Sequence, residues 1–157
     1  MDLRGCRWVY NEPRSHSGHN VVRHHLARLR ERKQFFATTM ESGAHQSSIC
    51  WILERRADAS AIDSTVLELE LQRSPEVGSL LRTIGALGPS PMPPWVASSV
   101  VPANLRHRLR RALLDMHADP AGAEILNAIG IAAFVAVRDR TYDPIRRMEA
   151  LGATVAL

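Results

Sequence analysis

Three short stretches of small polar residues hold the side chains of this sequence that could do chemistry. The stretches are Ser15-His16-Ser17-Gly18, Ser42-Gly43-Ala44-His45 and Asp63-Ser64-Thr65. Serine hydroxyls and free backbone N–H groups at the start of a helix form a ready site for an oxyanion, and the helix dipole adds roughly 0.3–1 kcal/mol. The first stretch therefore predicts an anion-binding turn, in which Gly18 allows a close backbone approach.

Two further side chains extend this candidate site. His45 can donate a hydrogen bond to an anion, and Asp63 can accept one from a protonated ligand oxygen or an ammonium group. Each position also has a purely structural interpretation, because serine and aspartate cap helices and a histidine in a first helical turn is often a surface residue. The candidate ligand-binding residues are Ser15, His16, Ser17, Gly18, His45, Asp63 and Ser64.

The histidines and arginines near the first stretch raise two other chemistries. A metal site would draw on His16, His19, His24 and His25. The adjacent pair His24-His25 points to different sides of a helix, and no carboxylate stands at a ligand spacing, so we predict no metal ion and no cofactor. The arginine-rich run 23–33 lacks interleaved aromatic residues and fits a solvated helix face, so we predict no nucleic-acid partner.

A small serine hydrolase is the enzyme alternative. Ser17, His45 and Asp63 are the residue types of a Ser-His-Asp triad. No G-x-S-x-G elbow or other nucleophile signature accompanies them, and holding an anion requires no chemistry. We therefore expect a binding protein and no enzyme.

The elements that must position these side chains follow from the apolar pattern. Strands are expected near 7–10, 35–39 and 59–62, and helices over about 18–31 and from His45 to about Arg56. Each polar stretch then stands where a strand ends and a helix begins. In an α/β protein with a mainly parallel sheet, such ends open onto one edge, where ligands bind.

The rest of the chain is expected to combine helices with short strands. Further strands are expected at 81–84, 95–98 and 134–137, and helices start at Pro102, Asp119 and about Tyr142, the last one stopping at Gly152. The stretch 66–71 alternates like a strand but follows an N-cap cluster, so the pattern leaves it open between strand and helix. The proline-rich run 89–94 predicts a stiff crossing segment.

The composition fits one ordinary globular domain. The chain has 157 residues, 45% of them hydrophobic and 23% charged, which excludes a disordered protein. Its net charge of +4 fits an anion-binding protein and an ordinary one equally well. Cys6 and Cys50 match no C-x-x-C or zinc spacing, and the sequence does not decide whether they form a disulfide. No apolar run reaches the about 18 residues of a membrane span, and no apolar segment of a signal peptide follows Met1.

Eight runs, taken in order, carry a family resemblance: 8–13, 15–18, 41–45, 57–64, 89–95, 105–117, 119–122 and 142–145. They are similar to the phosphate/phosphite/phosphonate-binding proteins, which are extracytoplasmic components of ABC importers with a type II periplasmic-binding fold. The resemblance covers nearly the whole chain. It implies a small phosphorus oxyanion as ligand, an ABC permease as partner of the full-length parent, and a periplasmic or extracytoplasmic location.

The resemblance also implies residue roles. The family's Ser-Thr-Ser-Gly anion turn corresponds to residues 15–18, with His16 in place of the usual threonine. His45 corresponds to an anion-contacting histidine, and Asp63 to an acidic position near the ligand's substituent or amine. The loop at Ser90 is expected to border the cleft, and residues 65–73 are expected to be helical.

The domain order follows from the same resemblance. Residues 1–88 would form the ligand-binding second lobe, 89–98 the crossing segment, and 99–157 the C-terminal helices and a strand of the first lobe. Family members carry an N-terminal lobe and an export signal before this point, so we expect the first lobe here to be incomplete. Its apolar faces would then be covered by self-association or loosely packed. A truncated product without function is the remaining alternative.

Overall fold

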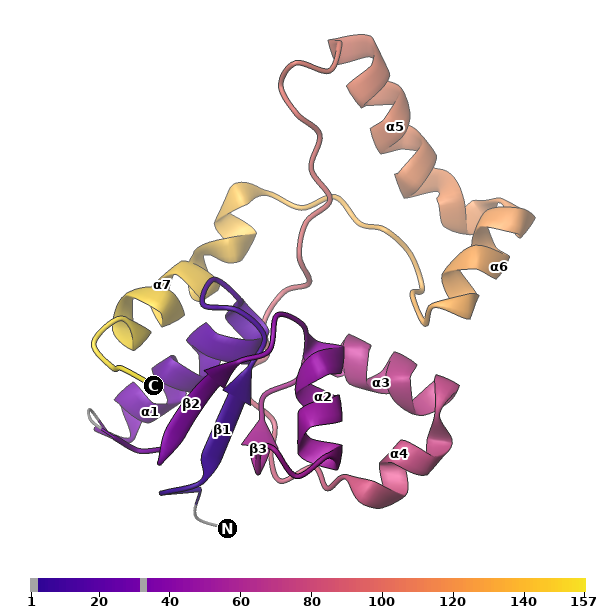
Figure 1. The fold of residues 1–157 in the computed structure, drawn as a ribbon. Coiled ribbons are helices and arrows are strands. Elements are labelled where there is room, and N and C mark those ends of the chain that lie inside the picture. The colour runs from indigo at the N-terminus through magenta and orange to yellow at the C-terminus, as the bar shows by residue number, and fades with distance from the viewer. Residues whose placement is uncertain (1–2, 32–33) are drawn as a thin grey trace. The chain divides into compact units, whose positions relative to one another are not determined.

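A three-stranded parallel sheet lies at the centre of the first half of the chain. Strand β1 (Arg7–Tyr10) pairs with β2 (Thr38–Glu41) on one side and with β3 (Ala59–Ser60) on the other, giving the order β2-β1-β3 (Figure 1). Because all three strands are parallel, their carboxyl ends meet at one edge. The expected α/β class with a parallel sheet and flanking helices is confirmed.

The structure is a computed structural model that describes residues 3–31 and 34–157. Arg32 and Lys33 of the arginine-rich run, and the first two residues of the chain, lie outside the described residues. The chain forms two compact units, one made of Met1–Ser90 with Asp143–Leu157 and the other of Pro91–Tyr142. The predicted lobe boundaries at 88 and 98 stay a prediction, and the C-terminal segment belongs to the unit that holds the sheet.

Helices cover both sides of the sheet in the first unit. The turn η1 (His16–Asn20) is π-helical and continues into α1, and α1 and α7 lie together on the side opposite α2 and α3 (Figure 1). The helices of this unit are α1 (Val21–Arg28), α2 (His45–Leu53), α3 (Ser64–Arg73), α4 (Pro75–Leu80) and α7 (Asp143–Gly152). The stretch 66–71 is therefore helical, as the family resemblance implied.

The core of the first unit joins the sheet to α1 and to the C-terminal segment. Trp8 of β1 stacks on Phe36 with ring centroids 4.6 Å apart, and Leu26 of α1 and Val155 are almost fully buried beside them. Strand β2 begins at Thr38, three residues later than expected, and Phe36, which precedes it, packs in this core. The apolar side of α1 therefore contributes directly to the core, as its helical spacing predicted.

The second unit is helical in its regular structure. It holds α5 (Ala103–Asp115) and α6 (Pro120–Ala128), with 3-10 turns η2 (Met116–Ala118) and η3 (Asp139–Tyr142). The strands expected at 95–98 and 134–137, and the one at 81–84 in the first unit, are wrong, because these segments have no ladder partner among the described residues. Valine and aromatic residues favour strands only where a neighbouring strand accepts them. Trp95 and Phe134 instead meet edge to face, 5.2 Å apart.

Two smaller features complete the fold. Cys6 and Cys50 are both free thiols, so the disulfide left open by the sequence is not formed. Among the helices of residues 3–31 and 34–157, none has both the length and the apolar character that crossing a membrane demands.

Candidate functional site

The first predicted stretch lies where β1 ends and the helix η1–α1 begins. Ser15 is the N-cap of this helix, and its Oγ accepts a hydrogen bond from the Gly18 backbone N–H at 3.1 Å. A serine N-cap satisfies one of the backbone donors that a helix start leaves free. Ser15 therefore caps the helix, as its structural interpretation predicted.

Ser17 and His45 come together across the edge of the sheet. The Ser17 Oγ lies 3.0 Å from Nε2 of His45, although 28 residues separate the two in sequence. Ser17 is in η1 and His45 is the first residue of α2, so the parallel pairing of β1 with β2 aligns their two junctions. Burial lowers the pKa of His45, and the nearby negative charge of Asp63 works against this effect.

The N-terminus of α2 differs from the other two helix starts. Its N-cap residue is Ala44, which has no side-chain group to accept a hydrogen bond from the first turn. The helix starts at η1 and α3 are capped by Ser15 and Asp63. The positive end of the α2 dipole and its first N–H groups are thus left for another acceptor, beside Ser17 and His45.

The third predicted residue, Asp63, caps α3. Its Oδ1 accepts hydrogen bonds from the Thr65 N–H at 3.0 Å and the Thr65 hydroxyl at 2.7 Å. Burial alone would raise the pKa of Asp63. The hydrogen bonds from Thr65, the charge of His45 and a hydrogen bond from Ser17 together outweigh burial, so the pKa lies below its ordinary value. Asp63 is therefore ionised near His45, and Ser64 next to it is an exposed first residue of α3.

His16 contacts the start of the proline-rich run. Its Nε2 lies 2.7 Å from the Ser90 Oγ, while Nδ1 is buried with no hydrogen-bond partner among the described residues. Burial lowers the pKa of the imidazole, so the neutral ring is favoured. His16 thus links the turn to Ser90, in the loop that was expected to border the cleft.

Asn11 also lies at this junction, although the residue pattern did not predict a role for it. A Cβ built on Gly18 would lie 2.0 Å from the Asn11 Oδ1 and 3.2 Å from the His45 Cε1, so the close approach at Gly18 is made by Asn11 and His45. The Asn11 side chain is buried, and its backbone oxygen accepts from the Gly43 N–H at 2.7 Å. Its position directly after β1 could have identified it, because ligands bind beside the carboxyl ends of parallel strands.

The geometry does not assemble the hydrolase triad. A Ser-His-Asp triad requires the aspartate to hold the histidine nitrogen remote from the serine. The Nδ1 of His45 has no hydrogen-bond partner in the described part of the chain, and Asp63 bonds to Thr65 instead. No group of three metal-ligating side chains gathers anywhere within residues 3–31 and 34–157.

The fold and the three polar junctions at one sheet edge define a ligand-binding α/β lobe. Residues 1–142 match the model of a family described as ABC transporter, phosphonate, periplasmic substrate-binding protein. The chain belongs to this phosphonate-binding family, and the resemblance drawn from the sequence is confirmed. The family is not catalytic, so the expected binding role is confirmed and the hydrolase alternative is wrong. Membership implies a phosphonate-type ligand, ABC transporter components as partners and the periplasmic class of binding proteins.

Proposed function

We propose that this chain holds a phosphonate-type oxyanion at the junctions that follow β1, β2 and β3, and presents it to an ABC permease. Ser17, His45 and the uncapped start of α2 would contact the anion. Phosphate and phosphite share the same oxygen chemistry and are the close competitors. The chain would bind its ligand without changing it.

The observation that carries this proposal is the 3.0 Å contact between the Ser17 hydroxyl and the His45 imidazole. It brings two hydrogen-bonding side chains from separate elements next to the free N–H groups of α2. An oxyanion needs such convergent donors and gains from the positive end of a helix dipole. A neutral solute would gain less from the same arrangement.

The ionised Asp63 favours a particular kind of ligand. Its carboxylate would repel a fully charged phosphate but attract an ammonium group or a protonated oxygen. A phosphonate with an amino substituent, such as 2-aminoethylphosphonate, offers both the anion for His45 and the cation for Asp63. We propose that Asp63 selects for such a substituent.

Calorimetric titration with phosphate, phosphite and 2-aminoethylphosphonate tests the proposal. We expect saturable binding that weakens about tenfold or more in Ser17→Ala, because a hydrogen bond to a charged group contributes about 1.5–3 kcal/mol. Ser79→Ala is the matched control, since Ser79 is exposed on α4 and donates only to the Glu76 carbonyl. A folded protein that gives no heat with any of the three ligands, or equal affinities in both variants, would contradict the assignment.

A further inference from the structure

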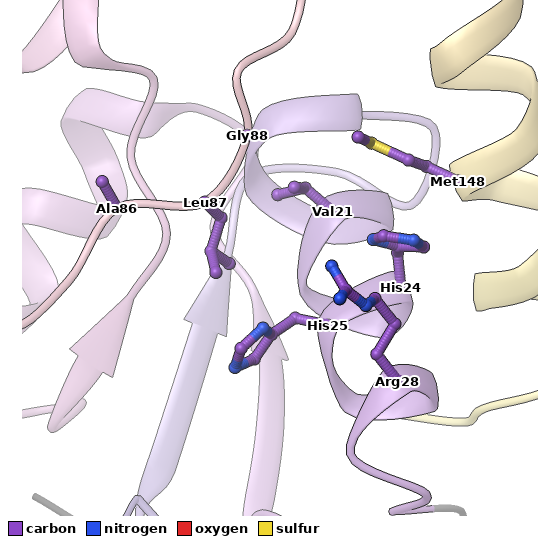
Figure 2. A pocket seen from close by; sticks show the side chains of 8 residues that line it. All are labelled: Val21, His24, His25, Arg28, Ala86, Leu87, Gly88 and Met148. Carbon is purple, nitrogen blue, oxygen red and sulfur yellow. The ribbon is translucent and has the colours of Figure 1, made fainter.

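A pocket separate from the Ser17–His45 junction lies along α1, about two helical turns beyond Ser17. It has a volume of about 200 Å³ and opens beside the segment that precedes the proline-rich run (Figure 2). Its lining includes Val21, His24, His25 and Arg28 of α1, Leu87, and Met148 of α7. All of them belong to the compact unit that contains the sheet.

Three nitrogen-bearing side chains of α1 lie on one wall of this pocket. Figure 2 shows the Arg28 side chain reaching between the imidazole rings of His24 and His25. Burial lowers the pKa of His24, and the positive charges of Arg28 and His25 lower it further, so a protonated His24 is disfavoured until an anion binds beside it. No carboxylate is among the described residues that line the pocket, and Glu149 of α7 acts on His16 rather than on His24.

The other wall is apolar. Val21, Leu87 and Met148 are its large apolar lining residues, and Val21 lies between the other two in Figure 2. A volume of about 200 Å³ is below the roughly 300–1,000 Å³ of pockets for drug-sized ligands, so a nucleotide would not fit. The pocket therefore combines donors for an anion with a small apolar surface.

We propose that this pocket binds a small organic oxyanion, with its charged group on His24, His25 and Arg28 and its apolar substituent against Leu87 and Met148. A bound anion would favour the protonated form of His24, and the guanidinium of Arg28 can bind two of its oxygens at once. The site shares no residue with the Ser17–His45 junction. The proposal for this pocket is therefore independent of the ligand proposed for that junction.

The test follows the imidazole carbon-bound proton resonances of His24 and His25 by NMR. The chain carries Ser17→Ala to weaken the first site, and the probes are n-butylphosphonate and inorganic phosphate at mildly acidic pH, where imidazoles begin to protonate. We expect saturable shifts at both histidines, with n-butylphosphonate bound more tightly than phosphate. Arg28→Gln should weaken binding about tenfold, as loss of a charged hydrogen-bonding group does. The matched variant Arg73→Gln, exposed on α3, should leave it unchanged.

A second variant tests the opposite wall. Leu87→Glu adds a carboxylate facing the cationic side chains, at a position already 43% exposed, and should abolish the shifts while the rest of the spectrum is preserved. Absence of saturable shifts at His24 and His25 would overturn the proposal, as would equal losses in Arg28→Gln and Arg73→Gln. Equal affinity for the two probes would overturn the role of the apolar wall. Resonances of His45 report the first site separately, so failure at one site is distinguishable from failure at the other.

Discussion

Ser15, Ser17 and Asp63 differ in what their side chains already do in the folded chain. Ser15 and Asp63 each accept hydrogen bonds from the first turn of the helix they cap. Ser17 instead shares its hydroxyl with His45, and Ala44 leaves the start of α2 uncapped. At residue scale, the groups of the candidate site that are not used in capping a helix thus belong to Ser17, His45 and the start of α2.

Gly18 gives a residue-scale prediction about stability. Gly18→Ala would push a methyl group to 2.0 Å from the Asn11 Oδ1, so Asn11 or His45 must move. We expect a loss of about 1–3 kcal/mol in the free energy of unfolding, the usual cost of overpacking. Chemical denaturation measures this loss, and calorimetry should show weaker anion binding because His45 is displaced.

Gly85→Ala is the control for this prediction. A Cβ on Gly85 would meet nothing within 4 Å, and its φ lies outside the left-handed range. We expect its free energy of unfolding to stay close to that of the parent. If Gly18→Ala were equally neutral, the close approach of Asn11 to Gly18 would be refuted.

Four histidines make stability depend on pH. Burial is the main cause that lowers the pKa of His16, His19, His24 and His45 below the ordinary value of 6.5. The unfolded chain therefore binds protons more readily, and the folded state loses stability as pH falls from about 6.5 through the lowered pKa values. Thermal unfolding at neutral pH and near pH ~5 should show a lower midpoint at the acidic value.

Asp58 separates this effect from ordinary acid unfolding. Hydrogen bonds from Arg7 hold the pKa of Asp58 at about 2, compared with an ordinary 3.8. Its contribution is present above pH 3.8 and is lost as pH falls toward 2. Replacing His45 by glutamine should reduce the dependence of the unfolding midpoint on pH between neutral pH and pH ~5, and should leave its dependence at lower pH unchanged. A midpoint that does not change between neutral pH and pH ~5 would contradict the histidine argument.

At element scale, the packing of α7 on α1 depends on one small residue. Gly152 is the last residue of α7, and a Cβ there would lie 3.0 Å from the His24 backbone nitrogen and 3.3 Å from the Asn20 carbonyl oxygen. The sequence predicted Gly152 as a helix stop, yet its φ is not left-handed. Its lack of a side chain is needed because two helices approach closely there.

Gly152→Leu should therefore separate α7 from α1. We expect a loss of about 1–3 kcal/mol in the free energy of unfolding, since the added side chain has no space and Val155 would leave the core. Ala150→Leu adds similar bulk at an exposed position of the same helix and should be nearly neutral. Denaturant titration of both variants decides the matter. Similar losses in the two would show that the contact is not specific to Gly152.

At the scale of the whole molecule, the unit Pro91–Tyr142 leaves large apolar side chains in solvent. Trp95 is 74% exposed and Val135 73% exposed, and Leu109 on α5 is nearly half exposed. Large apolar side chains that gather in an exposed patch mark interaction surfaces. The self-association expected from the sequence therefore stays a prediction that these residues support.

Sedimentation velocity over a range of protein concentrations tests this prediction. We expect the sedimentation coefficient to rise with concentration, because association would remove apolar side chains from water. The double variant Trp95→Ser with Val135→Ser should shift the distribution toward the monomer. A single compact monomer at every concentration, with cooperative unfolding, would contradict the prediction.

Local patterns of the sequence determined much of this protein. The helix from His45 follows from its apolar spacing, the strand 7–10 from its run of large residues, and the family from the order of its motifs. Secondary-structure preference and apolar spacing are properties of neighbouring residues, so they can be read from one segment alone. The strands expected at 95–98 and 134–137 failed because strand formation needs a partner from elsewhere in the chain.

Only the tertiary structure decided which side chains meet. The contact of Ser17 with His45, the approach of His45 to Gly18 and the pocket beside Arg28 each join segments that are distant in sequence. The parallel pairing of β1 with β2 sets the first of these, and helix packing sets the last. Such contacts depend on register and on close packing, which the residue pattern of one segment does not contain.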